Sequence, residues 1–193
     1  ADLKREGSFV ERNVTGWIDR YRGSETDEIP AMNETAAWLR AHCPPDTGAV
    51  LIHNDFKFDN LVLDPDDLTR IIGVLDWEMC SIGDPLMDLG VAFSYWLEPK
   101  DPDIGMVPCF LTREPGAMPR LELAERYAAL SGRAVNNLVF YYAFGLFKLA
   151  VIAQQIYYRF KQGLTHDPRF AALIMAVAAL AIRATDAIET GEI

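Results

Sequence analysis

The fold of this chain is decided by residues 51–90, which read LIHNDFKFDNLVLDPDDLTRIIGVLDWEMCSIGDPLMDLG. An apolar run at 49–52 leads into the polar triplet 53–55, and a second apolar run at 71–75 leads into Asp76. Between the runs lie another short apolar stretch and a turn rich in Asp and Pro. This alternation is typical of a β-hairpin. The sequence therefore predicts that polar side chains gather where the two strands end.

Oxygen-bearing side chains dominate this predicted site. Asp55, Asn60 and Asp76 supply two carboxylates and one amide. Mg²⁺ takes oxygen ligands, usually one or two carboxylates, with phosphates and water completing its shell. In phosphoryl transfer the protein positions the acceptor hydroxyl and offsets charge through such a metal. We therefore expect Asn60 and Asp76 to hold Mg²⁺, and ATP with it, and Asp55 to orient the hydroxyl and take its proton.

The spacing within the loop matches a catalytic pattern. His53, Asp55 and Asn60 follow H-x-D-x-x-x-x-N, which is the catalytic-loop pattern of the kinase superfamily, and Lys57 lies two residues after the candidate base. The candidate catalytic residues are therefore Asp55, Lys57 and His53. Two interpretations of Lys57 remain open: it contacts the transferred phosphate, or it is a solvated surface lysine.

The same stretch resembles the C-terminal lobe of the aminoglycoside phosphotransferase and choline kinase group, small-molecule relatives of the protein kinases. The residues that carry the resemblance are Asp-Trp-Glu at 76–78, in place of Asp-Phe-Gly, and GDPLMDL at 83–89. Within this group, the chain looks most similar to the kinase-like domains found beside acyl-CoA dehydrogenases or fused to them. The resemblance implies an α+β fold, mainly helical, with a small β-hairpin that carries the catalytic and metal-binding loops.

Residues beside the loop also have expected roles. The resemblance implies that His53 is a structural, hydrogen-bonding histidine and that Asp88 braces the catalytic loop without touching substrate. Asp84 followed by Pro85 is itself the pattern of a helix N-cap with proline at the first helical position. Glu78 lies near the predicted metal, either supporting it or on the surface.

A kinase of this superfamily also needs a Gly-rich loop over the phosphates and a strand lysine paired with a helix glutamate. No glycine-rich loop of that type precedes residue 51. By resemblance, residues 1–193 are the C-terminal lobe, and the N-terminal lobe is absent from this sequence. We expect this chain by itself to transfer phosphate slowly or not at all.

The chain is expected to divide around this core. Residues 1–48 would form linker helices, 49–90 the catalytic core, 98–118 a loop bordering the acceptor site, and 119–193 a helical substrate subdomain. Hydrophobic periodicity, caps and breakers predict helices at 8–22, 31–42, 85–97, 120–130, 135–162 and 168–188.

The longest predicted helix, 135–162, is rich in aromatic residues. Most of them, like those of helix 85–97, are expected in the core, while one or two line the acceptor pocket. Lys148 interrupts this apolar helix. Its side chain either extends to the surface or meets an anionic group of the substrate.

Composition excludes several classes of partner. The formal net charge of −10 disfavours nucleic acid, whose binding depends on Lys and Arg, and anionic membrane surfaces. The three cysteines form no CxxC motif, which indicates a reduced, cytoplasmic setting without a disulfide framework or zinc site. The most apolar run, 171–182, is too short to span a bilayer. The expected partner is a small molecule with a hydroxyl group, and not a nucleic acid or a membrane.

The sequence thus predicts an ATP-dependent phosphotransferase. Its relatives by resemblance point to a hydroxylated acyl thioester, or another metabolite, more than to an aminoglycoside. A polycation would need an acidic pocket, and only Asp101, Asp103 and Glu114 in the loop are candidates for one. Two alternatives stay open: a non-catalytic kinase-like binding module, which would be expected to lack the base or a metal residue, and a metal-dependent phosphohydrolase, which would need more Asp and His ligands. The acceptor, the preference for ATP over GTP and the oligomeric state stay undetermined.

Overall fold

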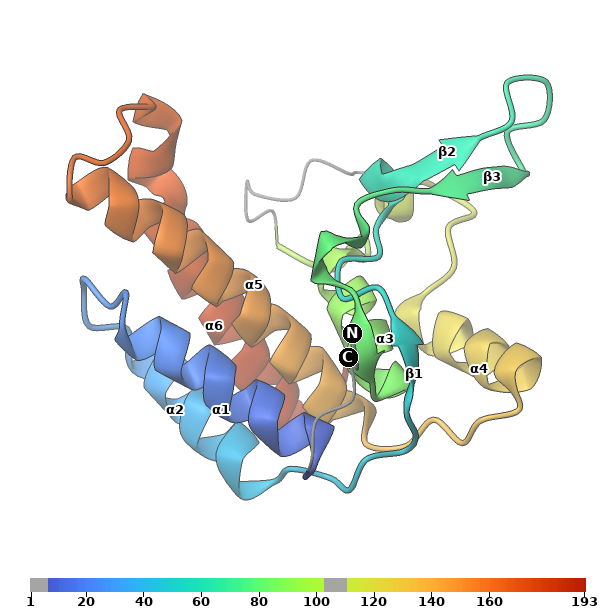
Figure 1. Ribbon diagram of the computed structural model, residues 1–193, viewed down its shortest axis with the longest axis horizontal. Helices are drawn as coiled ribbons and strands as arrows, with labels where there is room; N and C mark the ends of the chain where they lie inside the picture. The colour runs from blue at the N-terminus through green and yellow to red at the C-terminus, as the bar shows by residue number, and fades with distance from the viewer. Residues whose placement is uncertain (1–6, 103–110) are drawn as a thin grey trace.

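Helices form one side of the protein and short strands the other (Figure 1). The computed structural model describes residues 7–102 and 111–193. The helical side consists of α1 (Phe9–Arg22), α2 (Pro30–Ala41), α5 (Leu138–Lys161) and α6 (Leu173–Thr190). Helix α3 (Pro85–Tyr95) lies between this layer and the strands, and α4 (Arg120–Ser131) lies beyond it. The α+β class predicted from sequence is confirmed.

Helix α5 is the centre of the core. It contacts α1, α2, α3 and α6, and every residue from Phe140 to Val151 is buried. A helix that is covered on all sides needs no polar face, which explains its almost continuous apolar sequence. By length and composition, α5 and the segment Pro168–Thr190 could cross a membrane, although the apolar run 171–182 within the latter was expected to be too short. Inside the protein, 78% of the apolar stretch of α5 and 39% of that of Pro168–Thr190 are buried. A core helix of a globular protein has the same composition.

The strands pair differently from the sequence prediction. Strands β2 (Leu61–Leu63) and β3 (Ile71–Val74) form an antiparallel hairpin. Strand β1 (Val50–Ile52), which was predicted to share that hairpin, instead pairs antiparallel with β4 (Ser81–Gly83). The prediction missed β4 because its three residues are too short to show alternation. The 3₁₀ turn η2 (Trp77–Met79) joins β3 to β4 and so brings the chain back beside β1.

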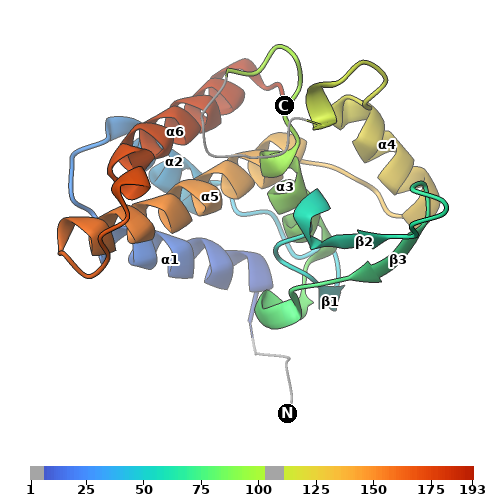
Figure 2. The ribbon, with the colours of Figure 1, turned by 90° about the horizontal axis from the view of Figure 1, so that it is seen from above.

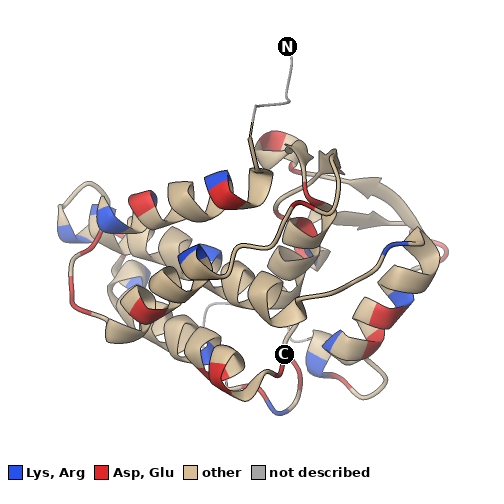
Figure 3. Ribbon diagram, turned by 90° about the horizontal axis from the view of Figure 1, so that it is seen from below, with Lys and Arg blue, Asp and Glu red and all other residues tan. Residues whose placement is uncertain are grey.

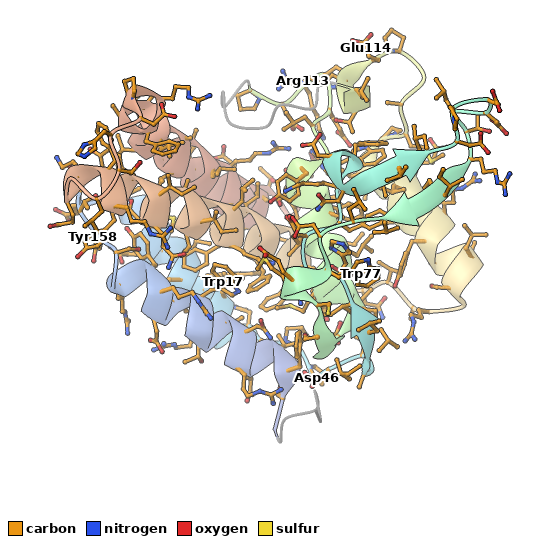
Figure 4. All side chains as sticks on the ribbon, turned by 45° about the horizontal axis from the view of Figure 1, so that its top comes forward. Trp17, Asp46, Trp77, Arg113, Glu114 and Tyr158 are labelled. Atoms are coloured by element: carbon orange, nitrogen blue, oxygen red, sulfur yellow. The ribbon has the colours of Figure 1, made fainter. Side chains whose placement is uncertain are left out.

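Helix ends follow the local signals closely. The Asp84 carboxylate caps α3 by accepting the backbone N–H of Leu86 at 2.8 Å, as predicted. Helix α1 is capped by Ser8 and also by Asp46, whose carboxylate accepts the backbone N–H of Phe9 at 2.7 Å (Figure 4). The last predicted helix begins as a 3₁₀ turn, η4 (Pro168–Ala172), and continues as α6.

The segment 98–102 is fixed by buried charges. Asp101 accepts hydrogen bonds from Arg120 on α4, pairs with Arg183 on α6, and lies 2.5 Å from each guanidinium. Although burial alone would raise the pKa of Asp101, hydrogen bonds from Arg120 and the backbone of Glu98 hold it below its usual value. Asp101, one of the three loop carboxylates that were candidates for an acidic pocket, therefore uses its carboxylate inside the protein. The predicted candidate Asp103 lies outside the described residues.

The predicted loop 98–118 has some helical structure of its own. Among its described residues, Leu111–Arg113 form the 3₁₀ turn η3.

Lys and Arg residues are interleaved with Asp and Glu along the described ribbon (Figure 3).

Helices α3 and α5 cross at backbone contact. A Cβ added to Gly90 would lie 2.2 Å from the carbonyl oxygen of Tyr141, and one added to Gly145 would lie 2.2 Å from that of Gly90. Real Cβ atoms do not approach backbone so closely, so glycine at both positions sets the distance between the helices.

We expect Gly145→Ala to destabilise the protein by about 1–3 kcal/mol or more, because the clash is with backbone that cannot move aside. The matched control is Gly16→Ala in α1, where the added Cβ would meet only the flexible end of Arg20, at 3.1 Å. That change should raise stability by about 0.5–1 kcal/mol, since alanine is the better helix former. Urea unfolding of both variants measures the difference, and equal effects would contradict the packing argument.

Candidate active site

The loop 53–60 is held by a carboxylate beneath it. Asp88, in the first turn of α3, accepts the backbone N–H of His53 at 2.8 Å and that of Asn54 at 2.7 Å. Two charge-assisted hydrogen bonds from adjacent amides fix the course of the chain as it leaves β1. This is the bracing role that the family resemblance implies for Asp88.

His53 joins the loop to the end of β3. Its Nε2 lies 2.7 Å from the carbonyl oxygen of Leu75, and its Nδ1 lies 3.2 Å from the backbone nitrogen of Asp55. A carbonyl only accepts and an amide N–H only donates, so the ring carries its proton on Nε2. Both nitrogens of this buried ring serve the loop, which fits the structural role expected for His53.

The Asp55 carboxylate is oriented by three side chains. Its Oδ1 accepts the Tyr95 hydroxyl at 3.0 Å, and its Oδ2 accepts the Lys57 ammonium at 2.8 Å and the Asn60 amide at 3.3 Å. The carboxylate is 14% exposed, so it is half-enclosed but open to a small molecule. Asp55 therefore has a fixed direction, and its Oδ1 keeps a free lone pair.

Tyr95 is a site residue that the sequence did not identify. It was predicted to lie in the core with the other aromatics of its helix, yet its hydroxyl contacts Asp55 across 40 positions of sequence. Burial and the neighbouring Asp55 raise the pKa of Tyr95 well above its usual value, so it stays a proton donor. No spacing signal could have found it, because the contact depends on how α3 packs.

The Lys57 side chain belongs to the site around Asp55. Its ammonium pairs with Asp55, lies 5.1 Å from the centre of the Tyr95 ring, and its side chain is 26% exposed. It is therefore not a free surface lysine. Its predicted contact with a transferred phosphate stays a prediction.

Asn60 and Asp76 are joined through the backbone. The N–H of Leu75 donates to the carbonyl oxygen of Asn60 at 2.8 Å, which places Asp76 next to the end of the loop. The Asn60 side-chain nitrogen faces Asp55, donating to its backbone carbonyl at 2.8 Å, which leaves the side-chain oxygen available. Asp76 has left-handed backbone, with φ 63°, and an exposed side chain that forms no hydrogen bond within the described ranges.

The donor set of Asn60 and Asp76 fits Mg²⁺. Across residues 7–102 and 111–193, no group of three or more His, Cys, Asp or Glu side chains is arranged to hold a metal. An amide oxygen and one carboxylate suit an ion that keeps water and takes substrate phosphates as its other ligands. Glu78, whose role the sequence left open, is exposed.

A cavity of about 740 Å³ lies between β1, the β2–β3 hairpin, α3 and α4. Figure 2 shows the hairpin and α4 on the same side of α3. Tyr95 and Lys57, which both contact Asp55, belong to its wall. The wall is otherwise mainly apolar and includes Leu51, Phe56, Phe58, Leu89, Trp96 and Leu123.

A second cavity of about 340 Å³ adjoins the first. The two share Phe58, Trp96 and Leu123. Its remaining wall includes residues of the predicted loop 98–118, among them Leu111, Thr112 and Glu114. The described part of this loop thus borders an apolar space that adjoins the larger cavity, whose wall includes Lys57 and Tyr95.

Lys148 corrects a sequence expectation. It was predicted to reach the surface or to meet an anionic substrate group, but it is 3% exposed and donates to the carbonyl oxygen of Asn54 at 2.5 Å. Burial lowers the pKa of Lys148 to about 8, although the nearby Asp55 and Asp88 favour its charged form.

The braced loop and the hairpin that ends at Asp76 have the architecture of a kinase-like phosphotransferase. The chain belongs to the phosphotransferase enzyme family APH, whose family model matches residues 1–134. The family recognised from residues 51–90 is confirmed.

Named relatives agree with this assignment. The chain is 33% identical over 159 residues to mouse acyl-CoA dehydrogenase family member 10, covering 80% of this chain and 15% of the relative. It is 35% identical over 164 residues to chicken acyl-CoA dehydrogenase family member 11, covering 82% and 21%. The chain thus spans about a fifth, or less, of the length of these relatives.

A solved structure has the same fold. The chain superimposes with a TM-score of 0.77 on a crystal structure from Ralstonia eutropha JMP134, of a protein assigned as an aminoglycoside phosphotransferase. The two are 26% identical, and the match covers 95% of this chain and 57% of that one.

The buried ammonium of Lys148 should make the unfolding free energy of the protein depend on pH in a way that is absent from Lys148→Met. The pKa of Lys148 is lowered to about 8 in the folded chain, against roughly 10.4 for an unfolded lysine. Between these values the unfolded chain binds a proton that the folded chain does not, so stability rises with pH in that window. From about pH 8 to about pH 10, the unfolding free energy of the wild type should rise relative to Lys148→Met by up to about 3 kcal/mol. Urea unfolding at a series of pH values measures both free energies. If the difference between wild type and Lys148→Met does not change with pH, the lowered pKa of Lys148 is contradicted.

Proposed function

We propose that the protein transfers the γ-phosphate of ATP to a hydroxyl group of a small molecule. The observation that carries the proposal is the Asp55 carboxylate, oriented by Tyr95 and Lys57 beside an apolar cavity, with Asn60 and Asp76 next to it. Membership of the phosphotransferase enzyme family supports the reaction class.

Each site residue has a role in this proposal. Asp55 accepts a hydrogen bond from the acceptor hydroxyl and takes its proton as the oxygen bonds to the γ-phosphorus. The bond between that phosphorus and the bridging oxygen breaks, and ADP leaves. Tyr95 and Lys57 keep the carboxylate pointed at that proton. Asn60 and Asp76 would hold Mg²⁺, which offsets the charge of the phosphates when it is bound.

The cavity supports an acceptor with an apolar body, such as a hydroxylated acyl thioester, over an aminoglycoside. Aminoglycosides are polycations and require carboxylates along their binding surface. Of the acidic residues in the larger cavity wall, Asp88 is already engaged with the loop 53–60, which leaves Asp59. Glu114 lies by the smaller cavity, and Asp101 is paired inside the protein.

The direct test is ADP formation by the full-length protein with Mg-ATP and a panel of acceptors. Coenzyme A thioesters of hydroxylated fatty acids should stimulate ADP release, and the same thioesters without the hydroxyl should not. Kanamycin and neomycin should give no more than the background rate. Stimulation by aminoglycosides alone would contradict the proposed acceptor, and phosphate release without any acceptor would favour a phosphohydrolase. The expectation that residues 1–193 alone act slowly stays a prediction, so the full-length protein is the appropriate sample.

Asp55→Asn and Asp76→Asn should separate the two parts of the site. Asp55→Asn should lower kcat by about 10²–10⁴-fold, the usual contribution of a general base, with little change in Mg-ATP affinity. Asp76→Asn should instead weaken Mg-dependent ATP binding, because it removes a charged ligand of the metal. Calorimetric titration with ATP, with and without Mg²⁺, measures binding beside the kinetic assay.

The matched control is Asp66→Asn, an exposed carboxylate in the β2–β3 turn, which should change neither quantity. Full activity in Asp55→Asn would rule out Asp55 as the base. Unchanged binding in all variants, with no turnover in the wild type, would favour a non-catalytic binding module.

A further inference from the structure

Lys148 is a buried charge in the middle of the most buried helix. It is the one charged residue between Phe140 and Val151, all of which are buried. A buried ammonium costs free energy unless it is paired and hydrogen-bonded. The structure gives this one a specific partner, the carbonyl oxygen of Asn54, at 2.5 Å.

Three polar groups of Asn54 are held by hydrogen bonds. Its backbone N–H donates to Asp88, its side-chain amide donates to the carbonyl of Met79 at 2.9 Å, and its carbonyl accepts from Lys148. Its backbone is left-handed, with φ 66°, a conformation that Asn tolerates but that needs support from its surroundings. The carbonyl bound by Lys148 belongs to the peptide that joins Asn54 to Asp55.

The ammonium has further neighbours on α1. It lies 5.4 Å from the centre of the Trp17 ring, and Arg20 stacks on the same ring at 4.9 Å. Figure 4 shows Trp17 between α1 and α5. An aromatic face and a carbonyl together replace much of the hydration that the ammonium loses. Trp17 thus helps to keep the ammonium directed at Asn54.

We propose that Lys148 is a positioning residue for the candidate base: its ammonium fixes the peptide between Asn54 and Asp55 and thereby the direction of the Asp55 carboxylate. With Asp88 bonded to the N–H and Lys148 to the carbonyl of Asn54, the loop is clamped by α3 and by α5. The catalytic consequence of this clamp rests on the proposed function, whereas the clamp itself does not.

Gln154 provides a matched control on the same helix. Its side-chain amide is buried and donates to the carbonyl of Ser24 at 2.7 Å and to the Thr26 hydroxyl at 2.9 Å. Like Lys148, it joins α5 to a distant segment of backbone. Its contacts are with the segment between α1 and α2, away from the loop 53–60. Gln154→Met therefore removes a comparable buried contact without touching the clamp.

The test compares Lys148→Met and Gln154→Met in the full-length protein by hydrogen–deuterium exchange. The backbone amides of residues 53–55 should exchange about 10- to 100-fold faster in Lys148→Met, the factor that corresponds to one hydrogen bond from a charged donor. They should exchange at the wild-type rate in Gln154→Met. Unchanged exchange at 53–55 in Lys148→Met, or equal acceleration in both variants, would overturn the proposal.

Kinetics provide the second readout. Lys148→Met should lower kcat by at least about tenfold with little change in the KM for Mg-ATP, and Gln154→Met should not. Faster exchange at 53–55 without a loss of kcat would overturn the positioning role. If no form of the protein phosphorylates any acceptor, the proposed function fails, while exchange alone decides whether the clamp exists. If Lys148→Met does not fold, Lys148→Gln gives the same test, because its amide is one bond too short to reach Asn54.

Discussion

The backbones of α3 and α5 touch where Gly90 meets Gly145, and the arrangement of the candidate site depends on this contact. Asp88 lies two residues before the crossing on α3, and Lys148 lies three residues after it on α5. A larger residue at either glycine would separate the helices. The two charged side chains could then no longer bind the N–H and the carbonyl of Asn54 from different helices. The geometry of the loop 53–60 therefore depends on the close packing of α3 against α5.

Several buried charges in this protein hold irregular backbone, in addition to any pairing with each other. Asp88 and Lys148 bind amide and carbonyl groups of the loop 53–60. Arg120 likewise binds the carbonyl of Trp96 while it pairs with Asp101. Loops contain backbone groups that no helix or strand satisfies, and a charged partner satisfies them strongly. The hydrogen bonds that these charges form with the backbone of the loop offset the free-energy cost of burying them.

The apolar cavity and the polar loop have different structural origins. The cavity is lined by side chains from several elements, namely the hairpin, β1, α3 and α4. The loop is bonded tightly to α3 and α5. The molecule thus combines a firmly held carboxylate, Asp55, with a mainly apolar space beside the residues that contact it.

The sequence by itself determined the parts of the site that lie close together in the chain. The spacing of His53, Asp55 and Asn60, the strand ending at Asp76 and the cap at Asp84 are local patterns, because loops, strand ends and helix caps are set by a few consecutive residues. Only the tertiary structure decided the pairing of β1 with β4, the contact of Tyr95 with Asp55 and that of Lys148 with Asn54. These last two join residues 40 and 94 positions apart. Which side of a helix meets a distant loop is fixed by packing in three dimensions, and no spacing in the chain records it.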